Sequence, residues 1–392
     1  MVVGAGFAGL AAADALAAGG AEVTVFEARD RVGGRVHSQR LGNGAVVELG
    51  AEFVLPGYDV LREMAARLGL ELYEKGTLYG DREPRGGPPV TRGELIAAAA
   101  ALREPGTGSL AGALERLVPS EGARAAVASR LAVSSAYELE DQDASALAEG
   151  AAGFGDFPSH GVVDGNDRIA LRLAERLGGV VCTSTAVLRV AWSAGGVVVR
   201  AGTAEVAADA CVIATPAPHA LELDWDPPLP GWKREALAAV PYGQAAKLFL
   251  PLASPPPPSQ TLSVPLRFWT WTQHGVPAAS SFAGSPSALE RLDVERGPER
   301  WTDAVRQLRR DLEYADGPPV LSTWHDDPWA RGAYSARTLS SPLVDEALAR
   351  AVGPVAFAGE HTAGPWHALM EGALRSGVRA AGEVEELLAA RA

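Results

Sequence analysis

The first 27 residues alternate between apolar runs and glycine clusters in an order that predicts a strand, a turn, a helix and a second strand. Residues 1–3 are apolar, glycines follow at positions 4, 6 and 9, and an Ala/Leu stretch runs to position 18. After a glycine pair, residues 22–27 have strand composition. This is the βαβ order of a nucleotide-binding unit. Almost no residues precede the first turn, so it stays open whether the natural N-terminus lies further upstream.

The same reasoning predicts elements along the rest of the chain. Leucine and methionine at helical spacing predict a helix over 59–70, and Ala/Leu/Glu/Arg-rich composition predicts helices within 93–150. Residues 79–89 are rich in Gly and Pro, which favours an exposed loop. Further helices are expected over 164–178 and 368–388, and strands within 180–182, 187–190, 196–199, 210–214, 264–273 and at the start of 355–362.

This order of elements predicts an α/β protein with a discontinuous Rossmann-type domain and a second domain inserted into it. The nucleotide-binding domain is expected to combine residues 1–75, 161–225 and 346–392. A substrate-binding domain, with a mixed sheet and a helical insertion, is expected from residues 76–160 and 226–345. No internal repeat is visible.

Composition indicates the cellular compartment and excludes some classes of partner. The 392 residues carry 35 Lys and Arg against 48 Asp and Glu, a formal charge of −13, so nucleic acid is not expected as a partner. The apolar run 95–102 is too short to span a membrane. Two cysteines, Cys182 and Cys211, suit neither a disulfide framework nor a metal site, and the histidines show no metal-ligand spacing. A cytoplasmic protein without a metal is expected.

The glycine spacing Gly4-x-Gly6-x-x-Gly9 predicts dinucleotide binding because of its context. It follows apolar residues and opens a helix, whose N-terminal amides and dipole can hold a pyrophosphate. An acidic residue, Glu27, ends the second strand 18 positions after Gly9. Its carboxylate can accept both hydroxyls of an adenosine ribose, whereas a 2′-phosphate would be repelled.

The run Glu27-Ala28-Arg29-Asp30-Arg31-Val32-Gly33-Gly34-Arg35 adds two glycines between guanidinium groups. It resembles the second glycine motif of the FAD-dependent amine oxidases, the family of monoamine, polyamine and L-amino-acid oxidases. Residues 48–53 resemble that family's loop beside the flavin ring, and residues 359–362 and 366–372 resemble its C-terminal flavin motif. The resemblance therefore covers both ends of the chain.

This resemblance implies FAD as the cofactor, bound without a covalent bond, because Ala333 stands where some members carry the cysteine that bonds to flavin. A helix N-terminus at Met370 is expected to stabilise the negative charge of reduced flavin. The implied cofactor-binding residues are Gly4, Gly6, Phe7, Ala8, Gly9, Glu27, Ala28, Arg29, Gly33, Gly34, Arg35, Gly50, Ala51, Glu52, Val187, Trp324, Gly359, Glu360, Leu369 and Met370.

Lys247, Tyr334 and Trp366 are the residues expected to act in catalysis on the same resemblance. Residues 240–247 are similar to the segment that ends in the family's lysine near flavin N5, which makes Lys247 the residue expected to hold a water there. Trp324 and Tyr334 have the spacing that places one aromatic beside the flavin and a tyrosine in the substrate cage. Trp366 is expected as a further cage or shielding aromatic.

The substrate cage departs from that of monoamine oxidases in its composition. Leu369 stands in place of the second cage tyrosine, and Glu52 and Phe53 differ from the residues common in the animal enzymes. Phe53, Trp324, Tyr334 and Leu369 are the substrate-binding residues expected. A bulkier or flatter substrate would suit such a cage.

The activity implied is oxidation of an amine by FAD, with hydride-equivalent transfer from the α-carbon to N5, imine hydrolysis and reduction of O2 to H2O2. The partners are then a small amine and O2, and the oligomeric state stays open between a monomer and a homodimer. A polyamine oxidase remains open. So does an L-amino-acid oxidase, which needs an arginine for the carboxylate; Arg82, Arg85, Arg267 and Arg331 are candidates. A flavin-dependent C–C desaturase and a non-catalytic flavoprotein are the remaining alternatives.

Overall fold

A five-stranded parallel sheet surrounds the first strand in the computed structural model, which describes residues 1–145, 147, 157–341 and 345–391. The strand order is β19-β12-β1-β2-β8, and β1 pairs in parallel with both β12 and β2. The strands are β1 (Val2–Val3), β2 (Val25–Phe26), β8 (Val181–Cys182), β12 (Cys211–Ile213) and β19 (Val355–Phe357). Segments far apart in sequence thus meet in one sheet, and the α/β prediction is confirmed.

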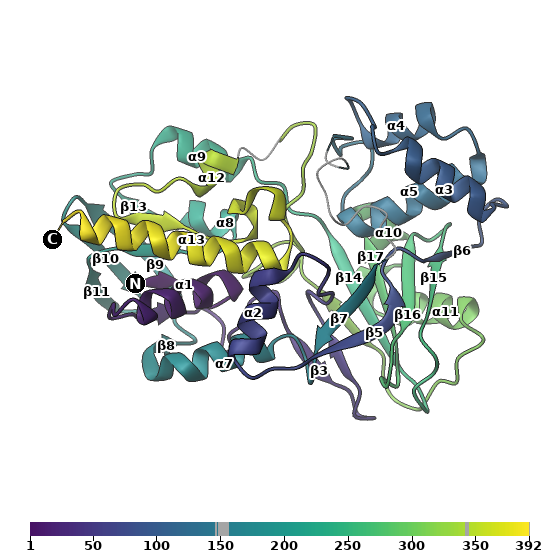
Figure 1. The fold of residues 1–392 in the computed structure, drawn as a ribbon, viewed down its shortest axis with the longest axis horizontal. Coiled ribbons are helices and arrows are strands. Elements are labelled where there is room, and N and C mark those ends of the chain that lie inside the picture. Colours follow the sequence, from purple (N-terminus) through teal and green to yellow (C-terminus); the bar gives the residue numbers. More distant parts are fainter. Residues whose placement is uncertain (146, 148–156, 342–344, 392) are drawn as a thin grey trace.

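Alternating residues of this sheet bury against two different layers, because successive strand side chains point to opposite faces. Val2, Val25 and Val212 belong to the core cluster that contains α1 (Phe7–Ala18), α2 (Asp59–Arg67), α7 (Arg168–Leu177) and α13 (Met370–Ala389). Val3 and Phe26 face the opposite cluster. The long helix α13 lies along α1 (Figure 1). Their contact is tight, since a Cβ on Gly377 would lie 2.1 Å from the Ala8 carbonyl oxygen.

The opposite face of the parallel sheet is covered by a smaller sheet with strand order β11-β10-β9-β13. Its strands β9 (Val187–Ser193), β10 (Gly196–Ala201) and β11 (Ala204–Ala208) form antiparallel hairpins, and β13 (Asp224–Asp226) pairs in parallel with β9. Around it lie α8 (Ala217–Glu222), α9 (Gly231–Ala238) and α12 (Asp345–Ala349).

A second large sheet is mixed and has the order β18-β14-β17-β16-β15-β6. Its strands are β6 (Glu83–Arg85), β14 (Ala245–Pro251), β15 (Ser259–Ser263), β16 (Phe268–Thr272), β17 (Ala278–Gly284) and β18 (Val320–Thr323). Helices α10 (Pro286–Arg291) and α11 (Glu299–Leu308) pack on it, and the fully buried Trp301 of α11 meets Phe268 of β16 edge-on. This mixed sheet matches the one expected for the inserted domain; the exact domain boundaries stay a prediction.

A helical group, α3 (Arg92–Ala101), α4 (Leu110–Leu117) and α5 (Glu121–Ser135), stands at one end of the molecule (Figure 1). Two antiparallel pairs complete the fold: β3 (Ser38–Arg40) with β4 (Val46–Glu48), and β5 (Leu72–Leu78) with β7 (Pro158–Val162). Short 3₁₀ turns occupy Gly178–Val180, Val294–Arg296, Glu360–Thr362 and Gly364–Trp366. No helix within the described ranges is long and apolar enough to cross a membrane.

Two sequence-based expectations need correction. Residues 79–89 are not simply an exposed loop, because β6 pairs in parallel with β15 and Arg82 is buried. Pro84 is tolerated there since β6 is the edge strand and needs no further ladder bond. The strand expected over 264–273 begins only at Phe268, after a turn in which Arg267 has a φ of +53°. Part of the region in which helices are expected, residues 146 and 148–150, lies outside the described residues.

Candidate active site

The turn between β1 and α1 forms a backbone cradle. Gly4 has a φ of +101°, and a Cβ there would lie 2.9 Å from the Ala214 carbonyl oxygen. Gly6 precedes α1 and offers no side-chain cap, so the first amides of the helix remain available to a ligand. Gly9 serves packing instead, since a Cβ on it would lie 1.9 Å from the Gly4 carbonyl oxygen.

Glu27 closes this cradle at the end of β2. Its Oε2 accepts a hydrogen bond from the Ala5 amide at 2.7 Å, and its Oε1 accepts one from the Arg29 amide at 2.9 Å. Each carboxylate oxygen keeps capacity for a further hydrogen bond from a ligand hydroxyl. The sequence-predicted acidic residue is therefore held in place by two backbone amides.

The second glycine pair meets the first motif directly. Gly33 forms a bridge with Gly6, and Gly33 and Gly34 have φ values of +95° and +60°. A Cβ on Gly34 would lie 3.3 Å from the Gly6 Cα, so a side chain there would crowd this approach. The flanking guanidiniums already have carboxylate partners: Arg29 pairs with Asp327, and Arg35 with Glu360 at 2.9 Å.

Glu360 lies where the C-terminal motif meets the cavity. Besides Arg35, its carboxylate accepts hydrogen bonds from the hydroxyl and amide of Ser335 and from the Ala368 amide. Burial alone would raise the pKa of Glu360, but the Arg35 charge and these donors lower it to about 2. Next to it, Leu369 offers no side-chain cap to α13, which begins at Met370 and opens its first amides towards the cavity.

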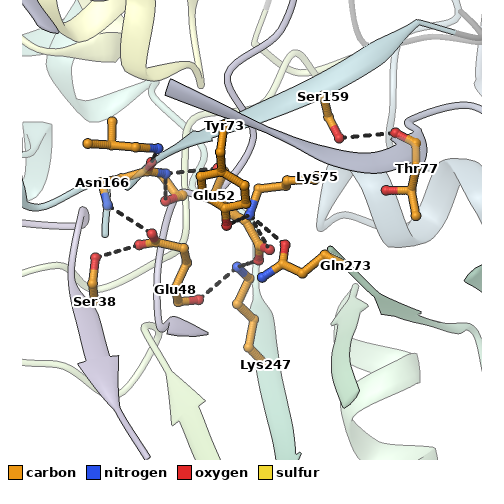
Figure 2. A network of polar contacts seen from close by, with 12 residues as sticks. Ser38, Glu48, Glu52, Tyr73, Lys75, Thr77, Ser159, Asn166, Lys247 and Gln273 are labelled. Carbon is orange, nitrogen blue, oxygen red and sulfur yellow. Dashed lines mark hydrogen bonds and ion pairs between the residues drawn. The ribbon is translucent and has the colours of Figure 1, made fainter. Parts of the chain in front are cut away.

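Lys247 of β14 belongs to a buried polar network (Figure 2). Its ammonium donates to the carbonyl oxygens of Glu48 at 2.9 Å and Gly50 at 2.8 Å, and to Glu52 Oε2 at 2.6 Å. Three acceptors take all three N–H bonds of a charged lysine. Burial lowers the pKa of Lys247, and the Glu52 charge opposes that shift.

Aromatic side chains form the far wall of the site. Phe53 stacks on Trp269 with ring centroids 5.2 Å apart, and Tyr79 meets Trp269 edge-on. The Tyr334 hydroxyl donates to the Ser134 carbonyl oxygen at 2.8 Å, and the Trp324 indole donates to the Leu49 carbonyl oxygen at 3.0 Å. These bonds leave the rings to line the space between them.

One cavity of about 700 Å³ connects the glycine cradle, Lys247 and the aromatic wall. It is lined by the predicted cofactor residues Gly4, Gly6, Phe7, Ala8, Glu27, Ala28, Arg29, Gly33, Gly34, Arg35, Gly50, Ala51, Glu52, Val187, Trp324, Gly359, Glu360, Leu369 and Met370. Of the other predicted site residues, Phe53, Lys247 and Tyr334 line it too. A long ligand could therefore run from the cradle to the aromatic wall.

Comparison with known proteins now decides the family. The family model described as flavin containing amine oxidoreductase matches residues 7–385. This chain belongs to that family. It is therefore a flavin-dependent oxidoreductase, as the sequence motifs predicted.

Individual relatives align with this chain over nearly its full length. A Mycobacterium tuberculosis protein provisionally named flavin-containing monoamine oxidase is 28% identical over 99% of this chain and 96% of its own. An L-amino-acid oxidase of Siganus canaliculatus is 27% identical over 98% of this chain and 85% of its own. The cyclohexylamine oxidase of Brevibacterium oxydans shares the fold, with a TM-score of 0.83, 22% identity and coverage of 99% and 98% of the two chains.

Two predicted residues of this flavin amine oxidoreductase lie elsewhere than expected. Gly9 does not line the cavity, because it sits beneath the cradle against Gly4. Trp366 does not line it either: its ring packs edge-on against Tyr58, with centroids 6.2 Å apart, and lies under the Arg375 guanidinium. The ring therefore faces Tyr58 at the start of α2 and not the cavity, so the structure does not place it in the cage.

Sequence reasoning missed Trp269 and Lys75 in this region and named Arg82 only among four candidates. Trp269 lines the cavity but was recognised only as part of a strand. Lys75 is fully buried behind Glu52, although a lysine in a strand is usually exposed. Arg82 lines the cavity, whereas it was only one of four candidate arginines. No local pattern distinguishes these residues, because their burial depends on strands that are distant in sequence.

Proposed function

We propose that this protein is an FAD-dependent amine oxidase that converts an amine, O2 and water into a carbonyl compound, ammonia or an amine, and H2O2. The observation that carries the proposal is one continuous cavity that joins a phosphate-type cradle to a lysine and an aromatic wall. Bound flavin would supply the acceptor for the hydride equivalent from the α-carbon and pass the electrons to O2.

The residues present fit FAD. The glycines at 4, 6 and 34 leave room that a Cβ would fill, and the open amides at the start of α1 suit a pyrophosphate. Glu27 would accept the ribose hydroxyls, and the start of α13 would face the negative end of the reduced ring. Ala333 offers no thiol, so the cofactor is expected to be released on denaturation.

The other end of the cavity orients the amine and excludes water. Trp269, Phe53 and Tyr334 line this end of the cavity with aromatic rings, and burial among them favours the unprotonated form of an amine. Lys247 is held as an ammonium by three acceptors, so a water at this lysine would have to displace one of them. No strong base from the protein is needed for this chemistry.

The deciding experiment is anaerobic mixing of the purified protein with amines, diamines, polyamines and L-amino acids while the visible flavin absorbance is followed. Bleaching by an amine that reverses with H2O2 release on admitting air supports the proposal. Flavin that no nitrogen compound bleaches would contradict it and favour a desaturase or a non-catalytic flavoprotein. Lys247→Met, with FAD still bound, is expected to lose turnover.

A second candidate, an L-amino-acid oxidase, is favoured by Arg82. Its guanidinium lies 3.9 Å from the Trp269 ring centroid and donates to the Ser134 hydroxyl at 3.1 Å, while its Nε has no hydrogen-bond partner. Among the described residues no carboxylate forms an ion pair with it, and burial lowers its pKa. A buried cation on a substrate cavity is best satisfied by an anionic ligand group.

Arg82→Met separates the two candidates. If a substrate carboxylate binds there, KM for amino acids should rise about 100-fold, roughly 2.7 kcal/mol, with simple amines unaffected. Arg85→Met is the control, because Arg85 is exposed and already pairs with Glu83 at 2.9 Å. Equal losses for amines and amino acids would contradict the carboxylate role.

A further inference from the structure

Two buried lysines share one carboxylate behind the cavity wall. Glu52 Oε2 lies 2.6 Å from Lys247 Nζ, and Glu52 Oε1 lies 3.1 Å from Lys75 Nζ. The side chains of Lys75 and Glu52 are 1% and 2% exposed. Glu52 lines the cavity and Lys75 does not, so Lys75 stands behind it as a second layer (Figure 2).

A bulge in β5 accounts for the inward direction of the Lys75 side chain. Four residue steps of β5, from Glu74 to Leu78, run opposite two steps of β7, from His160 to Pro158, so β5 bulges by two residues. Gly76 in the bulge has a φ of +79°. A bulge can redirect a side chain that would otherwise face solvent.

Other residues make room for Lys75 and satisfy it. A Cβ on Gly161 would lie 3.3 Å from its Nζ, so the glycine leaves the space that the ammonium needs. Gln273 Oε1 accepts from Lys75 at 2.8 Å, and the Tyr73 hydroxyl lies at 3.3 Å. The buried charge thus has a built site with three polar partners.

The charges of this network do not cancel. Two ammoniums face one carboxylate, and although burial opposes them, they lower the pKa of Glu52. The nearby Glu48 carboxyl, bonded by Ser38 and the Asn166 amide, has its pKa raised by burial to about 7. Tyr73 is the other titratable group here, and burial raises its pKa. While the Glu48 carboxyl is protonated, the network therefore carries one net positive charge, and ionisation of Glu48 at higher pH reduces that charge.

We propose that Lys75 is a second cation of the flavin site, coupled to Lys247 through Glu52. Glu52 acts as a positioning residue that fixes the Lys247 ammonium, and Lys75 supplies the charge that Glu52 would otherwise cancel. The resulting positive charge beside the cavity stabilises the negative charge of reduced flavin. This inference rests on the proposed function, because it requires flavin in the cavity.

The test is the midpoint potential of FAD in the purified holoenzyme and its variants. Lys75→Met should shift the equilibrium towards oxidised flavin by about threefold to tenfold; tenfold is about 30 mV for a two-electron couple. Lys75→Arg keeps the charge and should stay near the wild type. Lys233→Met is the control, since Lys233 is equally buried but donates to the carbonyl oxygens of residues 347 and 348.

The double variant Glu52→Gln/Lys75→Met provides the sharper readout. Removing one negative and one positive charge restores the net charge, so its potential should return towards the wild type, although each single variant departs from it. Glu52→Gln alone leaves two ammoniums facing each other, and its potential should gain an ionisation in its pH dependence. A network with only a structural role would lower stability without this compensation.

Four outcomes are possible, and each has a stated consequence. A lowered potential in Lys75→Met with recovery in the double variant supports the proposal. An unchanged potential in Lys75→Met, or no recovery, would overturn it while the enzyme remains a flavin oxidase. Should Lys75→Met not fold, the pH dependence of Glu52→Gln alone decides. A wild-type protein that holds no flavin would instead overturn the proposed function.

Discussion

The two ends of the cavity are built on different physical principles. At the cradle end, the ligand site is formed by backbone amides and by glycines that lack side chains. The two glycine motifs and Glu27 that form it lie close together in the chain, between Gly4 and Arg35. At the opposite end, Glu52, Lys75 and Lys247 come from three separate segments and act through buried charge. The cradle is consequently sensitive to added atoms, and the opposite end is sensitive to charge and pH.

The largest effect is expected from adding one atom at the cradle. Gly9→Ala places a Cβ 1.9 Å from the Gly4 carbonyl oxygen, and backbone cannot move aside as a flexible side chain can. We expect loss of FAD binding and a fall of about 3 kcal/mol in unfolding free energy. Flavin titration and denaturant unfolding measure these.

Gly382→Ala is the control for that change, because nothing lies within 4 Å of the added Cβ in helix α13. It should leave FAD binding intact and stabilise by up to about 1 kcal/mol. Equal behaviour of the two variants would remove the steric basis of the comparison.

At the charged end, the free energy of unfolding should depend on pH through Glu48. The pKa of Glu48 is raised from 4.5 in the unfolded chain to about 7 in the fold, so the folded state holds this proton more tightly. Unfolding free energy should therefore fall by on the order of 3 kcal/mol as pH rises from about 4.5 to about 7. In Glu48→Gln this decline is absent, and the variant becomes the more stable protein at pH 8.

That difference is read from unfolding curves of both proteins at several pH values. His361 acts in the opposite direction, since burial lowers its pKa to about 4 and stability is lost as pH falls from 6.5 towards 4. Subtracting the two proteins' curves isolates Glu48. Parallel curves would show that its carboxyl ionises equally in both states. Glu71→Gln controls for loss of one exposed negative charge.

Glu27→Gln should weaken FAD binding at the cradle by about 30-fold, roughly 2 kcal/mol. The substitution replaces the charged carboxylate, which accepts hydrogen bonds from the Ala5 and Arg29 amides and would accept those of the ribose, by a neutral amide. Titration of the apoprotein with FAD measures the loss. Glu22→Gln, at an exposed residue before the same strand, should not change the affinity. An unchanged affinity in Glu27→Gln would exclude the ribose role.

The smallest effect is expected at the aromatic wall. Tyr334→Phe removes the hydrogen bond to the Ser134 carbonyl oxygen but keeps the ring, so unfolding free energy should fall by about 1 kcal/mol. FAD affinity should stay the same, as measured by titration. A large loss of flavin from this variant would show that the two ends are not independent.

The sequence allowed much of the cradle to be predicted and less of the opposite end. Gly4, Gly6, Glu27 and Gly34 were named from spacing alone or from the family resemblance, and all line the cavity. Trp366 was named on the same resemblance and lies outside it, against Tyr58. A motif that places backbone carries over more reliably than one that places a side chain, whose direction depends on neighbouring elements.

The sequence by itself determined the parallel sheet's opening unit and the cradle, because positive φ values and close backbone approach depend on glycines that are near one another in the chain. Only the tertiary structure decided that Lys75 and Arg82 are buried and that Glu52 joins two lysines. The reason is physical: a charged residue in a strand is buried only when distant segments supply its partners.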